Sequence, residues 1–433
     1  MRICVITAGG AGMFCGSCMQ DNTLVRALRT AGADAVLLPT YTPVCVDEEN
    51  VSSHRVFLGG INVWLDSKLP GWARLPRIFK RWLDLPGVVR LLSRFGSSTR
   101  AADLGPLTVD LLSGTRGPGA AAIQELVQFI SRELRPDLVV FSNALLSGVV
   151  PELRRQWHGP LLCLLQGDDI FLRDLPEPWK TKSLDLIREN CQHFAGFLTH
   201  SHYYAGFISA YLGLERHKFS TVPLLIEDFA KVSEVPEEAI RNRLTVGYFA
   251  RICPEKGAFR FLNAAAAVLQ QRDDIDFQIG GFLPPQHQSR FQRELARVQA
   301  IRKDRLRWLG SPAERSEKFQ ILAGFDWLCV PSEYQEPKGI YVLEAALAGV
   351  PSILPEHGAF PERVADLGKG MLFDPNPDNA LTELLLNLRK QANPLSRQEL
   401  RQRCLSIHCV KSAGARSLDV LKALAEKQRI SGE

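Results

Sequence analysis

The chain lacks three features: a large net charge, a long apolar run and a signal-peptide pattern. Each would have indicated a particular class of protein, namely nucleic-acid-binding, membrane-spanning or secreted. Its net charge is only +5, from 52 Lys and Arg against 47 Asp and Glu, so bulk charge does not indicate a nucleic-acid partner. No apolar run approaches the roughly 20 residues of a membrane-spanning helix. The start, MRICVITAGG, reaches glycine after too short an apolar stretch for a signal peptide. We therefore expect a cytoplasmic protein that binds no nucleic acid.

The composition also excludes a disordered chain, because 45% of the residues are hydrophobic and 23% are charged, close to the globular average. A length of 433 residues indicates two or three domains. Several of the ten cysteines lie inside apolar runs such as ICVI and LLCLL, which predicts buried, reduced thiols. Cys15 and Cys18 have the spacing of a redox or zinc pair, but no second pair completes a structural zinc site. A thioredoxin-like role is the alternative for them.

The order of apolar runs and glycines predicts an α/β protein with two similar halves. A strand at 3–7, a glycine loop and a helix at 22–30 open a parallel sheet, and a second series begins with a strand at 244–249. Further strands are predicted at 35–38, 138–141, 161–165, 197–199, 276–280, 306–309, 327–330 and 351–354. Helices are predicted at 258–271, 286–301, 314–323, 340–348 and, as one amphipathic segment, 395–428.

We divide the chain into a domain at 1–230, a domain at 240–400 and a helical end at 401–433 that packs back on the first domain. An insertion at about 60–120 interrupts the first domain. Within it, 68–100 carries eight Lys or Arg and few acids, with aromatic residues between them. The plain interpretation is a helical insertion with a solvated basic face. The alternative is a surface for an anionic or lipid-linked partner, which would place the protein peripherally at a membrane.

The first glycine loop does not fit a dinucleotide-binding fingerprint. Met13 and Cys15 stand where the last glycine would be required, and no acidic residue ends the second strand. The loop is either a tight turn or a segment of small residues open to a ligand at the carboxyl end of the strand.

Two cations follow the strand at 244–249. Arg251 and Lys256 are five residues apart around a proline-containing turn. Arg offers a planar fork of donors and Lys a compact charge, so the pair suits a diphosphate.

The strongest pattern is PSEYQEPKGIYVLEAALAGVP, which begins at Pro331. A polar loop carries Glu336, and a helix begins near Gly339 and stops at Gly349. The first-turn amides of such a helix can receive a phosphate, while Glu344 can accept two hydrogen bonds from a ribose. An ordinary amphipathic helix with a surface Glu would not explain the order of these residues.

This segment resembles the two-glutamate signature of retaining glycosyltransferases with the GT-B fold, sequence family four (glycosyl transferases group 1). Other blocks resemble the family in the same order: GMFCGSCMQDNTLVRALRTAGADAVLL, FLTHSHYYAGFISAYLGLERHKFSTVP, GYFARICPEKG and EHGAFPERVADLGKGMLFDP. The likeness covers nearly the whole chain except 60–120. It implies two Rossmann-like α/β/α domains facing a central cleft, and an enzyme of cell-envelope glycan synthesis.

The resemblance also implies residue roles. Glu336 would face the donor sugar, while Arg251 and Lys256 would neutralise the leaving diphosphate, and these three are the implied catalytic residues. Four further residues match donor-binding positions: Gly16, Gly339, Ile340 and Glu344. Many family members have His where this chain has Gln166, which can bond a sugar hydroxyl but cannot shuttle a proton. Asp168 and His200 are further candidates for contacts to the sugar or the acceptor, although a core or surface histidine is the alternative for His200.

We therefore predict a metal-independent hexosyltransferase without a cofactor, which moves a sugar from a nucleotide-diphosphate sugar to a glycan, lipid-linked or small-molecule acceptor. Asp274 and Asp276 spell an Asp-x-Asp metal pattern, but they lie at the start of a strand, away from the ligand edge. The segment 310–315 is expected to contact the base through backbone and packing groups. The alternatives are a nucleotide-sugar epimerase or phosphorylase of similar fold, or an inactive relative that only binds sugar nucleotides.

Overall fold

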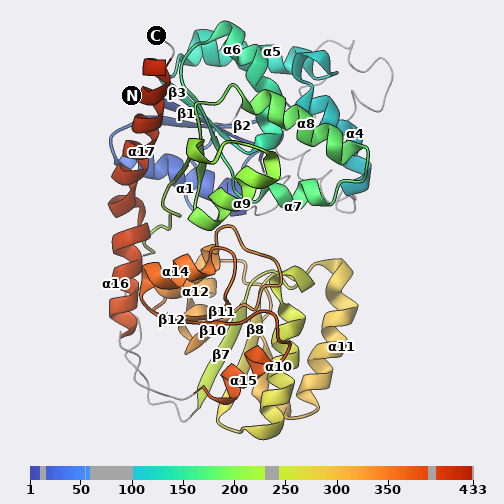
Figure 1. The fold of residues 1–433 in the computed structure, drawn as a ribbon. Coiled ribbons are helices and arrows are strands. Elements are labelled where there is room, and N and C mark those ends of the chain that lie inside the picture. Colours follow the sequence, from blue (N-terminus) through green and yellow to red (C-terminus); the bar gives the residue numbers. More distant parts are fainter. Residues whose placement is uncertain (10–15, 54, 59–100, 230–242, 389–395, 432–433) are drawn as a thin grey trace. The chain divides into compact units, whose positions relative to one another are not determined.

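The computed structural model describes residues 1–433 except 10–15, 54, 59–100, 230–242, 389–395 and 432–433 (Figure 1). The chain divides into two compact units: unit 1 comprises Met1–Leu225 with Ala413–Glu433, and unit 2 comprises Ile226–Ser412. The return to unit 1 thus begins at Ala413 rather than at 401. Most of the insertion, including 68–100, lies outside the described residues.

Unit 1 is built on a six-stranded parallel sheet of order β2-β1-β3-β4-β5-β6. β3 and β4 read LVVFS and LLCL and are buried throughout, as expected for strands covered on both faces. The strands are β1 Arg2–Thr7, β2 Asp34–Pro39, β3 Leu138–Ser142, β4 Leu161–Leu164, β5 Gly196–Thr199 and β6 Phe219–Thr221. The α-helices are α1 Gly16–Thr30, α4 Ala101–Leu112, α5 Ala120–Gln128, α6 Val150–Gln156, α7 Asp168–Arg173, α8 Trp179–Cys191, α9 His202–Leu212 and α17 Val410–Ser431.

Unit 2 repeats this plan with a parallel sheet of order β12-β11-β10-β7-β8-β9 (Figure 1). Its strands are β7 Leu244–Phe249, β8 Ile275–Gly280, β9 Leu306–Trp308, β10 Trp327–Cys329, β11 Ser352–Pro355 and β12 Gly370–Phe373. Its α-helices are α10 Ala258–Gln271, α11 Gln288–Gln299, α12 Arg315–Ala323, α13 Ile340–Leu347, α14 Phe360–Leu367, α15 Ala380–Leu386 and α16 Arg397–His408. The predicted fold class, α/β with two Rossmann-like domains, is confirmed.

The helices predicted at 286–301, 314–323 and 340–348 match α11, α12 and α13 to within two residues at each end, but two other predicted helices differ more in extent. α1 begins at Gly16, six residues before the predicted start at 22, because its polar first turns are buried and bonded rather than exposed as a loop. The terminal helical segment is two helices, α16 and α17, separated by extended backbone at Cys409. The Ile226 amide donates to the His408 carbonyl and the Val410 amide donates to the Ile226 carbonyl, so a β-bridge takes the place of helical bonds there.

The cysteines that the structure describes are all free thiols, and all except Cys45 are buried. Cys15 lies outside the described residues, so the predicted pair with Cys18 is seen only in part. Burial raises the pKa of the Cys4, Cys163 and Cys329 thiols, which favours the neutral form.

Candidate active site

The loops that follow β7 and β10 lie side by side because the two strands are neighbours in the unit 2 sheet. The Glu255 carbonyl accepts hydrogen bonds from the Glu333 amide at 3.1 Å, the Tyr334 amide at 3.2 Å and the Ser332 hydroxyl at 2.9 Å. Gly257 has φ +70°, and a Cβ there would lie 1.8 Å from the Pro331 carbonyl oxygen, so only glycine fits this approach. The two loops therefore form one bonded platform.

Lys256 and Glu336, predicted from separate motifs, form an ion pair across this platform. The exposed fractions of their side chains are 18% and 8%. The Tyr341 hydroxyl also donates to Glu336, at 3.3 Å. Burial by itself raises the pKa of Glu336, but the Lys256 ammonium, Lys338 and the Gly339 amide outweigh it and hold that pKa below its usual value. Glu336 is therefore an ionised carboxylate at neutral pH.

The loop after β11 supports Glu336 from the other side. Gly358 has φ +61°, and a Cβ there would lie 2.7 Å from both the amide nitrogen and the carbonyl oxygen of Glu336. The Ala359 amide donates to the Glu336 carbonyl at 2.8 Å. Contacts from the loops after β7 and β11 thus fix the backbone of the loop that carries this carboxylate.

Helix α13 begins at Ile340, four residues after Glu336, where the sequence predicted a helix start near Gly339. Gly339 is the N-cap residue in the left-handed region, φ 73°, and Ile340 is the first helical residue. First-turn amides have no acceptor inside a helix and can receive an anion. The helix ends with a Schellman motif, in which the Gly349 amide donates to Ala346 and the Val350 amide to Ala345.

Arg251 is exposed at the end of β7, in the same loop as Lys256. The buried Tyr248 hydroxyl donates to the Arg251 carbonyl at 2.8 Å and lies 3.3 Å from the Lys256 carbonyl. These contacts fix the turn that carries both cations.

Glu344 forms an ion pair that the sequence did not predict. Its carboxylate lies 2.8 Å from the Lys318 ammonium of α12, and both side chains are mostly buried. The carboxylate predicted to hold the ribose is therefore oriented by a cation.

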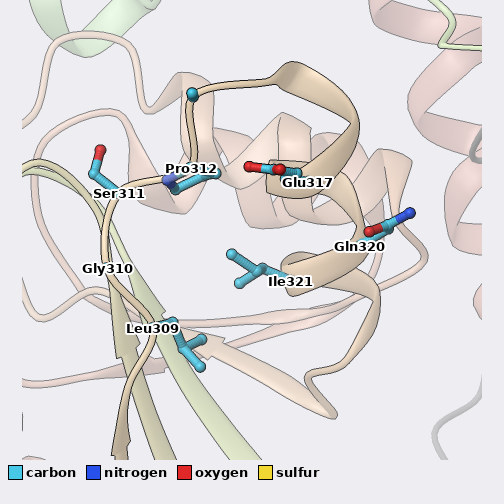
Figure 2. Close-up of a pocket in the computed structure, with 8 residues that line it drawn as sticks. Leu309, Gly310, Ser311, Pro312, Glu317, Gln320 and Ile321 are labelled. Carbon is cyan, nitrogen blue, oxygen red and sulfur yellow. The ribbon is translucent and has the colours of Figure 1, made fainter.

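An open pocket of about 650 Å³ lies between the loop after β9 and α12 (Figure 2). Figure 2 shows Glu317 and Ile321 on the helix pointing toward the loop that carries Ser311 and Pro312. Leu309, Gly310, Ala313 and Gln320 complete the lining. The lining overlaps the segment 310–315 that the sequence assigned to base recognition.

In unit 1, Gln166 belongs to a buried polar cluster. Its amide nitrogen lies 2.8 Å from the Asp21 carboxylate and 2.9 Å from the Ser142 hydroxyl. The Ser142 and Thr7 hydroxyls each donate to Asp21 at 2.6 Å. No motif in the sequence pointed to Asp21, Ser142 or Thr7. The available signal was that Asp21 shares a helical face with the apolar Val25, where a carboxylate is unexpected.

Asp168 is buried at the start of α7, and its carboxylate is hydrogen-bonded to backbone amides. Its carboxylate accepts from the Ala144 amide at 2.6 Å and from the Gln166 amide at 2.9 Å. Burial raises its pKa, and these amides oppose that rise. Asp168 thereby ties the loop after β3 to the loop after β4, and its carboxylate oxygens face protein rather than solvent.

The remaining predicted residues differ in exposure. His200 is 3% exposed after β5, with its Nδ1 atom 3.3 Å from the Val222 carbonyl oxygen, which is the environment of a core histidine. Gly16 is the exposed first residue of α1, with no atom within 4 Å of an added Cβ. Asp274 and Asp276, at the amino end of β8, pair with Arg272 and Arg305.

Comparison with known proteins gives a family match for part of the chain. Residues 233–404 match the model of the family described as Glycosyl transferases group 1. Over 146 residues the chain is 29% identical to the D-inositol 3-phosphate glycosyltransferase of Corynebacterium glutamicum (strain R), a match that spans 33% of this chain and 34% of that relative. The matched length is thus about a third of the relative.

Solved structures match over nearly the whole length. HepE from Anabaena, in complex with UDP and glucose, gives a TM-score of 0.62 at 15% identity and covers 98% of this chain and 100% of that one. Sucrose-phosphate synthase from Thermosynechococcus elongatus gives 0.63 at 16% identity, with 98% of each chain covered. These likenesses confirm the two-domain GT-B type of fold, and the family match supports a glycosyltransferase. Within the described residues, no helix has both the length and the apolarity needed to cross a membrane.

Proposed function

We propose that the chain is a retaining glycosyltransferase that moves a sugar from a nucleotide-diphosphate sugar to an acceptor hydroxyl held by unit 1. The observation that carries the proposal is the Lys256–Glu336 ion pair beside the start of α13, inside the stretch that matches the family model. The carboxylate suits sugar hydroxyls, and the cation and helix amides suit a diphosphate.

The proposed reaction follows from these groups. The bond from the anomeric carbon to the diphosphate oxygen breaks, and the acceptor oxygen bonds to the same face of that carbon. The acceptor proton passes to the departing diphosphate oxygen. Negative charge grows on that oxygen, so Arg251, Lys256 and the Ile340 amide stabilise the transition state more than the ground state. This scheme uses no side-chain nucleophile, and it uses no metal ion.

The base would occupy the pocket of Figure 2, and Glu344 would accept hydrogen bonds from the ribose. Because the HepE structure contains UDP and glucose, UDP-glucose is the first donor to test, followed by GDP- and ADP-sugars. The name of the curated relative makes D-inositol 3-phosphate the first small-molecule acceptor to test. A donor that binds the folded chain raises its melting temperature by mass action.

The decisive experiment measures transfer at subsaturating donor. Glu336→Gln and Arg251→Ala should each lower kcat/KM by roughly 100-fold or more, because Glu336 would position the donor sugar and Arg251 would stabilise the charge of the leaving diphosphate. Glu333→Gln is the matched control, because Glu333 is an exposed carboxylate three residues earlier in the same loop. Unchanged transfer in either of the first two variants would refute the proposal.

A further inference from the structure

We propose that the pocket of Figure 2 selects guanine through the Glu317 carboxylate, so that the donor is a GDP-sugar. The inference rests on the proposed transferase function and names the base of its donor. The solved HepE structure contains UDP, but an identity of 15% carries only the fold over to this chain. The base is therefore argued from the side chains of the pocket itself.

The pocket combines apolar walls with a carboxylate that points inward. Pro312 on the loop after β9 and Ile321 on α12 supply apolar surface, which suits the flat face of a base. Figure 2 shows the Glu317 carboxylate pointing from α12 toward the loop, whereas the Ser311 hydroxyl points away from α12 and the Gln320 amide points away from the loop. Among the side chains labelled in Figure 2, Glu317 thus presents its polar group to a ligand in the pocket.

Glu317 is available to a ligand and lies close to the residue proposed for the ribose. Its side chain is exposed, and within the described part of the chain it makes no hydrogen bond or ion pair. The next residue of α12, Lys318, lies 2.8 Å from the Glu344 carboxylate. Because a base is bonded directly to its ribose, neighbouring residues of one helix are suited to contact the two. Gly310 leaves room beside the loop, since an added Cβ there would meet nothing within 4 Å.

A carboxylate in this place selects a base by its hydrogen-bond donors, because an ionised carboxylate can only accept. Guanine presents two neighbouring donors, N1–H and N2–H, which match the two carboxylate oxygens. Uracil presents one N–H between two carbonyl oxygens, and adenine presents one amino group beside an acceptor nitrogen. Either would place an acceptor against Glu317. The carboxylate is hydrated in the open pocket, so a base that replaces this water with two donors is favoured over one that supplies a single donor.

The position of Glu317 also fits a purely structural role. Acidic residues are common in the first turn of a helix, where they stabilise its positive end, and Glu317 lies in the first turn of α12. That role gives no preference among bases. Selectivity between bases is therefore the readout that separates base recognition from helix stabilisation.

The first test measures binding of GDP, IDP, UDP and ADP to the full chain by calorimetry, without sugar or acceptor. IDP is GDP without the 2-amino group, so it lacks one of the two donors. We expect the wild type to bind GDP at least about tenfold more tightly than each of the other three, as for a bidentate contact to a base. Glu317→Gln should weaken GDP binding by at least about tenfold and bring GDP and IDP to within about threefold of one another. Glu333→Gln removes an exposed carboxylate that does not line this pocket, and it should keep the preference for GDP.

The binding measurement can overturn the inference in two ways. Equal affinity of the wild type for GDP and IDP, or tighter binding of UDP or ADP than of GDP, would overturn the selection of guanine. A preference for GDP that survives Glu317→Gln would overturn the role of Glu317.

The second test keeps the sugar constant and measures transfer from GDP-glucose and from UDP-glucose at subsaturating donor. In the wild type kcat/KM should be at least about tenfold higher with GDP-glucose, and Glu317→Gln should remove most of that advantage. Glu336→Gln should lower transfer from both donors alike, because Glu336 would face the sugar. Transfer from UDP-glucose alone would overturn the base assignment and support the proposed function. If neither donor is used, the nucleotide affinities still decide the base, and failure of all four nucleotides to bind would overturn both proposals.

Discussion

The Lys256 ammonium and the Glu336 carboxylate form a largely buried ion pair between loops 80 residues apart in the sequence. The pair joins the group assigned to the leaving diphosphate to the group assigned to the donor sugar. Two motifs that are separate in the sequence are therefore one site in the fold.

Replacing Lys256 by Gln would leave Glu336 buried beside a neutral side chain. Removing one partner of a buried pair costs about 3–5 kcal/mol, and we expect a loss of that order in the free energy of unfolding at pH 7. Urea unfolding of the wild type and of Lys256→Gln measures it. Adding Glu336→Gln removes the carboxylate that has lost its Lys256 partner and should recover much of the loss.

The stability difference between the wild type and Lys256→Gln should also depend on pH. The folded-state pKa of Glu336 is lowered, so the wild-type pair contributes stability above the unfolded pKa, near 4.3, and loses it as pH falls through the folded pKa. In Lys256→Gln the carboxyl group can protonate and relieve its burial as pH falls. The stability difference should therefore be largest at pH 7 and shrink toward pH 4, roughly where carboxyl groups protonate. A difference that stays constant over this range would contradict the assignment.

Alanine substitutions at Gly257 and Gly310 distinguish the cost of backbone strain from the cost of a steric clash. Both have positive φ, +70° and +72°, but an added Cβ meets the Pro331 carbonyl oxygen at 1.8 Å in the first case and nothing within 4 Å in the second. We expect Gly310→Ala to cost about 1–2 kcal/mol from backbone conformation alone. Gly257→Ala should cost clearly more and should also lower transfer, because it separates the loops of Lys256 and Glu336. Equal unfolding midpoints for the two variants would refute this account.

Glu344→Gln should weaken donor binding without changing the chemical step. The loss of hydrogen bonds to a charged acceptor, about 1.5–3 kcal/mol, raises the donor KM roughly 10–100-fold while kcat changes little. Lys318→Met keeps the carboxylate and should have a smaller effect. Steady-state kinetics with varied donor checks both, and an equal or larger effect of Lys318→Met would assign the pair to stability instead.

The basic segment 68–100 lies outside the described residues, and its role stays a prediction from sequence. If it contacts a membrane surface, the wild type should bind vesicles that contain anionic lipid, and raised salt should weaken that binding. A variant with the eight Lys and Arg of 68–100 neutralised should bind such vesicles less, while neutral vesicles serve as the control. Equal binding of the two proteins would remove the membrane interpretation.

Features encoded by short stretches of sequence were predicted well. The bounds of α10 at 258–271 were predicted to the residue, and the helix after Glu336 begins where Gly339 indicated. The sequence also placed Lys256 and Glu336 after predicted strands. These strands, β7 and β10, end at the same edge of a parallel sheet, so the two side chains meet there.

Features that depend on distant partners were not predicted. Asp21 and Gln166 are 145 residues apart, and nothing local shows that a carboxylate on α1 is bonded there. The pairing of Glu344 with Lys318 joins two helices, and the break at Cys409 depends on a bridge to Ile226. The short strands β6 and β12 were missed because each has only three or four residues and little periodicity.

The central claim is transfer of a sugar with retention at its anomeric carbon. The most direct measurement follows a ¹³C-labelled UDP-sugar, or the GDP- or ADP-sugar that raises the melting temperature most, by NMR with and without acceptor. The account predicts that nucleoside diphosphate and glycosylated acceptor appear in equal amounts, with the anomeric configuration of the donor. Inversion at that carbon, or conversion of the donor into an epimer without acceptor, would contradict it.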